Sequence, residues 1–158
     1  MRERYVGTCP FQIVVNRHLV QQGYTIISTS GFASRERYSR YVDEDKTIGQ
    51  IRKAGFDVVI YNKEKQRFIG AEVKPEFSWN EFQRALGQVI VHLMDPEWRR
   101  RVHEGMIIMP LNRLCDSKVM IKKKELLKRF TRALENCRRH GYRVSIKYLA
   151  VCSRIVQF

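Results

Sequence analysis

Long apolar runs are missing from this chain of 158 residues. No hydrophobic stretch approaches the roughly 20 residues that a membrane-spanning helix needs, which argues against a membrane protein. The first residues, MRERYVGTCPFQ, also lack the apolar core of a secretory signal. We therefore expect a cytoplasmic protein.

Cysteine is scarce, and its spacing excludes the common zinc motifs. The cysteines are Cys9, Cys115, Cys137 and Cys152, so no pair is close enough to form a C-x₂₋₄-C half-site. Cys137 falls on the apolar stripe of an expected helix and Cys152 in an expected strand, which favours buried free thiols. Disulfides stay open as an alternative, because intracellular proteins of thermophiles also form them.

Acidic residues are few relative to basic ones. The chain has 30 Lys and Arg against 16 Asp and Glu, a net charge of +14. Such an excess favours a polyanionic partner, most often nucleic acid. An anionic membrane is disfavoured, because we find no basic amphipathic helix with an apolar face rich in Trp, Phe and Leu. A solvated basic surface without a partner is the alternative.

Composition and periodicity predict one α/β domain over residues 1–158. Hydrophobic residues make up 44% and charged residues 29%, as in globular proteins. Segments with helical apolar spacing alternate with strand-like runs, without a repeat or a linker between them. The expected helices are 8–22, 78–94, 97–102 and 122–140, and the expected strands are 24–29, 56–61, 68–74, 105–111 and 142–152. The expected fold is a mixed β-sheet flanked by helices, with a C-terminal helix and strand at 120–152.

Several residues predict where the helices begin and end. Thr8 is expected to cap the first helix. Ser78 and Glu81 form a Ser-x-x-Glu capping box for the helix that follows the hairpin. Gly141 is expected directly after the last helix, where a left-handed conformation is common.

The segment 30–54 is long and irregular for a compact domain, which is typical of functional loops. Its basic residues are interleaved with tyrosines, a pattern that suits phosphate contacts and base stacking. A solvated insertion is the alternative. The candidate nucleic-acid contacts are Arg35, Arg37, Arg40, Arg52 and Lys53.

The stretch FDVVIYNKEKQRFIGAEVK predicts a hairpin whose turn is centred on Glu64 and Lys65. In that register Asp57 opposes Glu72, with Cβ atoms about 4.5–5.5 Å apart. Lys74 lies on the same face, because side chains alternate along a strand. We expect this charged face to be open and the other face to be core, since the other face carries Val58, Ile60, Ile69, Ala71 and Val73.

Two opposed carboxylates destabilise each other unless one takes up a proton or a cation binds. Lys74 compensates one negative charge, and a hard divalent cation with oxygen ligands would compensate the rest. Mg²⁺ or Mn²⁺ in such a place activates water and polarises phosphoryl oxygens. A surface cluster of weak ion pairs is the alternative.

The same residues resemble the PD-(D/E)XK nuclease superfamily, in which a helix and a strand lead into a hairpin bearing Asp and then Glu-x-Lys, followed by a helix. Asp57 matches the first acid, and Glu72-Val73-Lys74 matches Glu-x-Lys. The resemblance covers about residues 8–111. The following helix resembles the resolvase-like and RecB-like branches, which often carry Gln and Tyr four residues apart. Gln88 and His92 hold that spacing here, with a polar flank of the helix as the alternative.

This resemblance implies a restriction-endonuclease-like fold and Mg²⁺- or Mn²⁺-dependent hydrolysis of DNA in repair or recombination. It implies that Asp57, Glu72 and the Val73 carbonyl hold the metal. Lys74 would serve the nucleophile or the transition state, and Gln88 would position water or a phosphate.

The sequence also departs from the family in two places. Phe56 stands where the family has its nominal Pro, and Gln12 and Asn16 stand where the first helix often carries an acid. Glu3 is the nearest upstream acid, so one or two metals remain alternatives. A non-catalytic nucleic-acid-binding module and a nuclease-like subunit of a larger DNA-processing complex are alternative functions. The oligomeric state is open, with a homodimer as one alternative.

Overall fold

The computed structural model describes residues 2–7, 9–30, 55–96, 102–112, 116–150 and 155–157. Helices and strands are interspersed along the chain, and the expected mixed α/β class is confirmed. The helices are α1 (Phe11–Gln21), α3 (Trp79–Met94) and α5 (Ser117–Arg139). The strands are β1 (Glu3–Tyr5), β2 (Thr25–Thr29), β3 (Val58–Asn62), β4 (Arg67–Val73), β5 (Glu76–Phe77), β6 (Val102–Pro110), β7 (Arg143–Leu149) and β8 (Ile155–Gln157).

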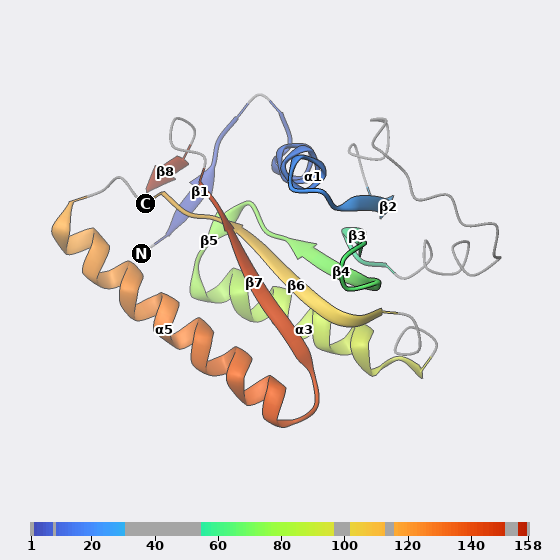
Figure 1. Ribbon diagram of the computed structural model, residues 1–158. Helices are drawn as coiled ribbons and strands as arrows, with labels where there is room; N and C mark the ends of the chain where they lie inside the picture. The colour runs from blue at the N-terminus through green and yellow to red at the C-terminus, as the bar shows by residue number, and fades with distance from the viewer. Residues whose placement is uncertain are drawn as a thin grey trace.

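The larger sheet has the strand order β2-β3-β4-β6-β7 (Figure 1). Strands β2, β3 and β4 form an antiparallel meander, whereas β4, β6 and β7 run parallel. Parallel neighbours cannot be joined by a tight turn and need a crossover. Helix α3 lies in the crossover from β4 to β6, and α5 lies in the crossover from β6 to β7.

Helices cover both faces of this sheet (Figure 1). Residues of α1 pack on the face that carries Val58, Ile60 and Ile69. Residues of α3 and α5 pack on the opposite face, which includes Val59. The expectation that the charged face of the hairpin is open is therefore wrong, and Glu72 on that face is only 2% exposed. The physical reason is that the crossover helix α3 lies over this part of the sheet and excludes water from it.

Helix α3 begins and ends as the sequence predicts. Its N-cap is Ser78, whose hydroxyl oxygen accepts a hydrogen bond from the backbone N–H of Glu81 at 3.2 Å. The Glu81 carboxylate pairs with Arg84 at 2.7 Å. The helix lies so close to β6 that a Cβ on Gly105 would come within 2.1 Å of a Val89 methyl group. A larger residue at that position would push α3 away from the sheet.

The other helices differ from expectation at their N-termini. Helix α1 begins at Phe11 with Pro10 as its N-cap, which offers no side-chain cap, and the expected cap Thr8 lies outside the described residues. Helix α5 begins at Ser117, several residues earlier than expected, because Asp116 caps it by accepting a bond from the Val119 N–H at 2.9 Å.

The C-terminal end of α5 agrees with the sequence. Gly141 follows it with a φ of +87°, the left-handed conformation that glycine adopts readily. The expected short helix at 97–102 falls mostly outside the described residues, and its last residue, Val102, already belongs to β6.

A second sheet, which the sequence pattern did not predict, has the order β5-β1-β8. Its strand β1 carries Glu3, which is fully buried and forms an ion pair with the buried Lys123 of α5. The Glu3 carboxylate also accepts a hydrogen bond from the N–H of Asn112 at 3.0 Å. These contacts tie the N-terminal strand to α5 and to the segment after β6.

Two of the cysteines can be placed. Cys9 and Cys137 are free thiols and are half-buried. Cys115 and Cys152 lie outside the described residues.

In the part of the chain that the structure describes, none of the helices combines the length and apolar character that crossing a bilayer requires.

Candidate functional site

The β3–β4 hairpin brings the two predicted acids together. Val58 pairs with Ala71 and Val59 with Gly70, which confirms the predicted register. Asp57 stands one residue before β3 and therefore lies opposite Glu72. Its carboxylate accepts a hydrogen bond from the backbone N–H of Val73 at 2.9 Å. The first acid is thus attached to the strand that carries the second.

The Glu72 side chain is buried, with 3% of its surface exposed. Burial, followed by the negative charge of Asp57, raises the pKa of Glu72 from 4.5 to about 8. An apolar ring contributes to the dry surroundings, since Phe56 packs over Gly70 on the same face of β4. A Cβ on Gly70 would lie 2.5 Å from that ring. The site therefore favours a neutral Glu72, or a cation beside it.

Lys74 points from the end of β4 toward α3. Its ammonium group donates a hydrogen bond to the side-chain carbonyl of Gln88 at 2.5 Å. The same nitrogen lies 4.0 Å from the Glu72 carboxylate. The backbone N–H of Lys74 donates to the carbonyl of Ile108 at 2.9 Å, which anchors this residue to β6. Lys74 and Gln88 thus meet beside Glu72.

His92 lies one helical turn after Gln88 on the same side of α3. Its Nε2 is 3.8 Å from the Glu72 carboxylate, and its ring centroid is 4.6 Å from that of Phe56. Burial lowers the pKa of His92, so the imidazole is neutral near pH 7. Gly55, with a φ of +77°, passes close to this ring, and a Cβ there would lie 3.1 Å from it. Both members of the predicted pair therefore face the site.

Gln12 of α1 positions the backbone at Asp57. Its side-chain amide donates to the carbonyl of Asp57 at 2.7 Å and to the hydroxyl of Thr29 at 2.9 Å. Asn16 also donates to Thr29, at 2.8 Å. In place of an acid, the first helix thus supplies amides that hold β2 and the start of β3. Glu3 takes no part in this arrangement, because it is buried in the second sheet.

Sequence reasoning missed two of these supporting contacts. The role of Gln12 depends on a contact between distant parts of the chain, and no local pattern indicates it. The packing of Phe56 had a signal, because a glycine such as Gly70 inside a strand often marks a close approach.

The ligands available for a metal are few. Within the described ranges, no group of three or more His, Cys, Asp and Glu side chains gathers around one point. Asp57 and Glu72 are the carboxylates that face each other, and one oxygen of Asp57 already accepts from Val73. A pair of carboxylates suits Mg²⁺, which usually keeps waters or substrate phosphates as its other ligands. It suits zinc poorly, because zinc sites usually take three or four protein ligands.

The structure therefore brings together Asp57, Glu72, Val73, Lys74 and Gln88. The predicted nucleic-acid contacts Arg35, Arg37, Arg40, Arg52 and Lys53 lie outside the described residues.

Comparisons with protein-family models, with curated proteins and with solved structures each found no match for this chain. Its function is therefore to be inferred from its own residues.

Proposed function

We propose that this chain is a divalent-metal-dependent nuclease of the PD-(D/E)XK type that hydrolyses DNA phosphodiesters. The observation that carries the proposal is the buried Glu72 carboxyl group, 3% exposed, held opposite Asp57 with Lys74 beside it. Burying two like charges together is costly, and such arrangements are concentrated at functional sites.

A purely structural salt bridge accounts poorly for this cluster. Lys74 forms its short hydrogen bond, 2.5 Å, with the neutral Gln88, and stays 4.0 Å from Glu72. His92 is neutral near pH 7, so it supplies no positive charge to compensate Glu72 once that carboxyl group loses its proton. A bound cation would compensate the carboxylates and leave Lys74 available to the substrate.

The order of the elements also supports the proposal. Helix α1 and strand β2 precede the β3–β4 hairpin, and α3 follows it. This is the order of helix, strand, hairpin and helix that the resemblance implies. The pair Gln88 and His92 occupies the face of α3 nearest the hairpin, where the resemblance implies a Gln and a Tyr.

Each residue has a role in this scheme. Asp57 and Glu72 would hold Mg²⁺ or Mn²⁺, with the Val73 carbonyl as a further ligand. When bound, such a cation lowers the pKa of a ligated water and polarises a phosphoryl oxygen. The ammonium group of Lys74, oriented by Gln88, would stabilise the negative charge that develops on the phosphorus oxygens. Glu72 has to release its proton before it can act as a ligand.

The net charge of +14 favours DNA as the polyanionic substrate. Binding should weaken steeply with salt, because each neutralised phosphate releases counterion. A contribution from Arg35, Arg37 and Arg40 remains a prediction from the sequence.

Cleavage of labelled single-stranded, duplex, flapped and four-way-junction DNA with Mg²⁺ or Mn²⁺ tests the proposal. We expect cleavage of at least one substrate by the wild type and none by Asp57→Asn. Glu64→Gln, a change on the exposed turn of the same hairpin, is the matched control and should cleave normally. DNA binding without cleavage in either metal would instead favour the non-catalytic binding module. One observation favours this second candidate function. Among the described residues, no three or more metal-ligating side chains gather around one point.

A further inference from the structure

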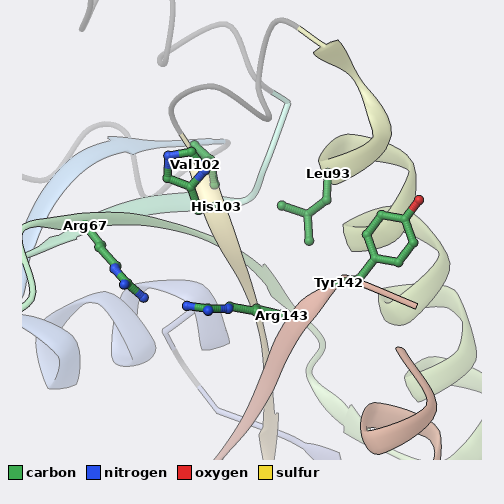
Figure 2. Close-up of a pocket in the computed structure, with 7 residues that line it drawn as sticks. Arg67, Leu93, Val102, His103, Tyr142 and Arg143 are labelled. Carbon is green, nitrogen blue, oxygen red and sulfur yellow. The ribbon is translucent and has the colours of Figure 1, made fainter. Parts of the chain in front are cut away.

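A basic groove lies at the end of the larger sheet where β4, β6 and β7 begin. Two adjoining cavities form it, with volumes of about 380 and 440 Å³, and both are lined by Arg67 and Arg143. Figure 2 shows the guanidinium groups of these two arginines pointing toward each other, with Leu93 and Tyr142 on another side of the cavity. The predicted nuclease site uses none of these residues.

The groove is separate from the carboxylate site. Arg67 begins β4, and Glu72 lies near its end, about 16 Å further along at about 3.3 Å per residue. The two side chains also point to opposite faces of the sheet. Ile69, on the same face as Arg67, packs with α1, whereas Glu72 faces α3. A ligand in the groove would therefore not touch Asp57 or Glu72.

Glu104 holds the two arginines side by side. Strand pairing places it next to Arg143 on β7 and beside Ile69 on β4. Its carboxylate accepts from Arg67 at 2.7 Å and lies 4.0 Å from Arg143. The arginine side chains keep 41% and 63% of their surface exposed. Each guanidinium has five N–H donors, so most of them remain available to a ligand.

The charges lining the groove suit an anion. Lys65, Arg67, Arg138 and Arg143 line the larger cavity, and Glu104 is the acid among its described lining residues. His103 adds a further donor in the smaller cavity. Paired guanidinium groups match the oxygens of a phosphate better than lysines do, because the planar fork donates two parallel hydrogen bonds.

We propose that this groove binds the phosphodiester backbone of a second segment of nucleic acid, remote from the cleavage site. The basic residues come from the β3–β4 turn, the start of β4, the end of α5 and the start of β7, and together they line one cavity. Because the Arg67 and Arg143 side chains keep 41% and 63% of their surface exposed, these donors suit the phosphates of an extended chain better than one enclosed phosphate. The proposal rests on the proposed function in taking nucleic acid as the polymer that this chain binds.

The test compares the DNA affinity of two double variants by fluorescence anisotropy, in EDTA so that no cleavage occurs. Arg67→Ala/Arg143→Ala changes the groove. Lys118→Ala/Lys122→Ala removes the same charge from exposed positions on the first turns of α5. We expect the groove variant to bind single-stranded and duplex DNA at least tenfold more weakly, and the control to bind within about twofold of the wild type. The slope of log K against log salt should become shallower by about 1.4 to 1.8, the contribution of two phosphate contacts. Equal losses in the two variants would overturn the proposal.

A replacement variant and additional competition measurements distinguish this proposal from its alternatives. If the double groove variant unfolds, Arg143→Gln alone replaces it, since Arg143 is 63% exposed and its contact with Glu104, at 4.0 Å, is longer than the 2.7 Å contact that Arg67 makes. Displacement of DNA from the wild type by millimolar inorganic phosphate would show a single-phosphate site and count against the proposal. Binding of poly-glutamate with the same dependence on Arg143 would also count against the proposal, because it indicates an acidic protein partner.

In the Asp57→Asn background, the loss of DNA affinity caused by the groove variant should persist. Loss of groove dependence there would contradict a separate site, whereas absent cleavage by the wild type would contradict the nuclease proposal alone.

Discussion

The carboxylate of Asp57 accepts a hydrogen bond from the backbone N–H of Val73 at 2.9 Å. Val73 stands between Glu72 and Lys74, so this bond fixes the first acid to the strand that carries the other two charged groups. The consequence is that two carboxyl groups lie close together in a dry place, where both cannot readily be ionised. Burial and the charge of Asp57 together raise the pKa of Glu72 to about 8.

Catalysis should depend on each of the three charged side chains. We expect Asp57→Asn, Glu72→Gln and Lys74→Ala to lower the rate of DNA cleavage at least about 10²–10³-fold, the loss typical of removing one group that stabilises charge in the transition state. Circular dichroism should show that each variant stays folded. The measurement is single-turnover cleavage with Mg²⁺, with Glu64→Gln as the control. Retained activity in Glu72→Gln would rule out the assignment.

Stability without metal should fall as the pH rises. The folded pKa of Glu72, about 8, lies above its ordinary value of 4.5, so the folded state binds this proton more tightly than the unfolded state does. The contribution to stability is complete below pH 4.5 and is lost as the pH rises through about 8. We expect a drop of several degrees in Tm between pH 5 and 9 in EDTA, since about 1 kcal/mol moves Tm by about 2–4 °C in a domain of this size. Glu72→Gln should flatten this profile, and an unchanged slope in that variant would contradict the prediction.

Metal binding should stabilise the protein and release a proton. Mn²⁺ or Mg²⁺ binds the native state and should raise Tm, more at pH 8 than at pH 6, because Glu72 has to deprotonate first. Calorimetric titration with Mn²⁺ in the presence of DNA, in two buffers of different ionisation enthalpy, measures both effects. Ca²⁺ should bind through the same oxygen ligands but support cleavage poorly, as the nuclease resemblance implies. Equal heats in the wild type and in Asp57→Asn would place the metal elsewhere.

Gln12 should matter for stability although it carries no charge. Gln12→Leu removes the donor to the Asp57 carbonyl, 2.7 Å away, while the backbone N–H of Ser30 still donates to that carbonyl at 3.0 Å. Because the acceptor keeps one partner, we expect the loss typical of one hydrogen bond, about 0.5–1.5 kcal/mol in the free energy of unfolding. The matched control is Gln21→Leu, an exposed position on the same helix, which should change it by less than about 0.5 kcal/mol. Urea unfolding measures the free energy of unfolding of both variants. Equal losses in the two variants would show that Gln12 does not position the backbone at Asp57.

The Glu3–Lys123 ion pair should be costly to break from one side. Both residues are buried, at 0% and 1% exposed, so Lys123→Met leaves the Glu3 charge without its ammonium partner. We expect a loss of about 3–5 kcal/mol, measured by chemical denaturation. Glu3→Gln/Lys123→Met should recover much of it, since neither member of this pair then carries a charge and the amide oxygen still accepts from the Asn112 N–H. A double variant no better than the single one would contradict this explanation.

The sequence by itself determined the local features of this protein. The hairpin register follows from strict alternation on both sides of a short turn, and the structure confirms it at Val58 and Ala71. Ser78 caps α3 and Gly141 follows α5, because both roles depend on backbone groups within a few residues. The meeting of Asp57 and Glu72 is a consequence of that register.

Only the tertiary structure decided how these residues are surrounded. The crossover helix α3 covers the charged face of the hairpin, so Glu72 is buried and its pKa rises, although alternation had indicated an open face. The Gln12 contact with Asp57, the pairing of β1 with β8 and the Arg67–Glu104–Arg143 arrangement join residues far apart in the chain. The spacing of apolar residues in a segment indicates which face of that helix or strand is apolar and which is polar. Which distant segment covers each side depends on the packing of the whole domain, and no local pattern contains that information.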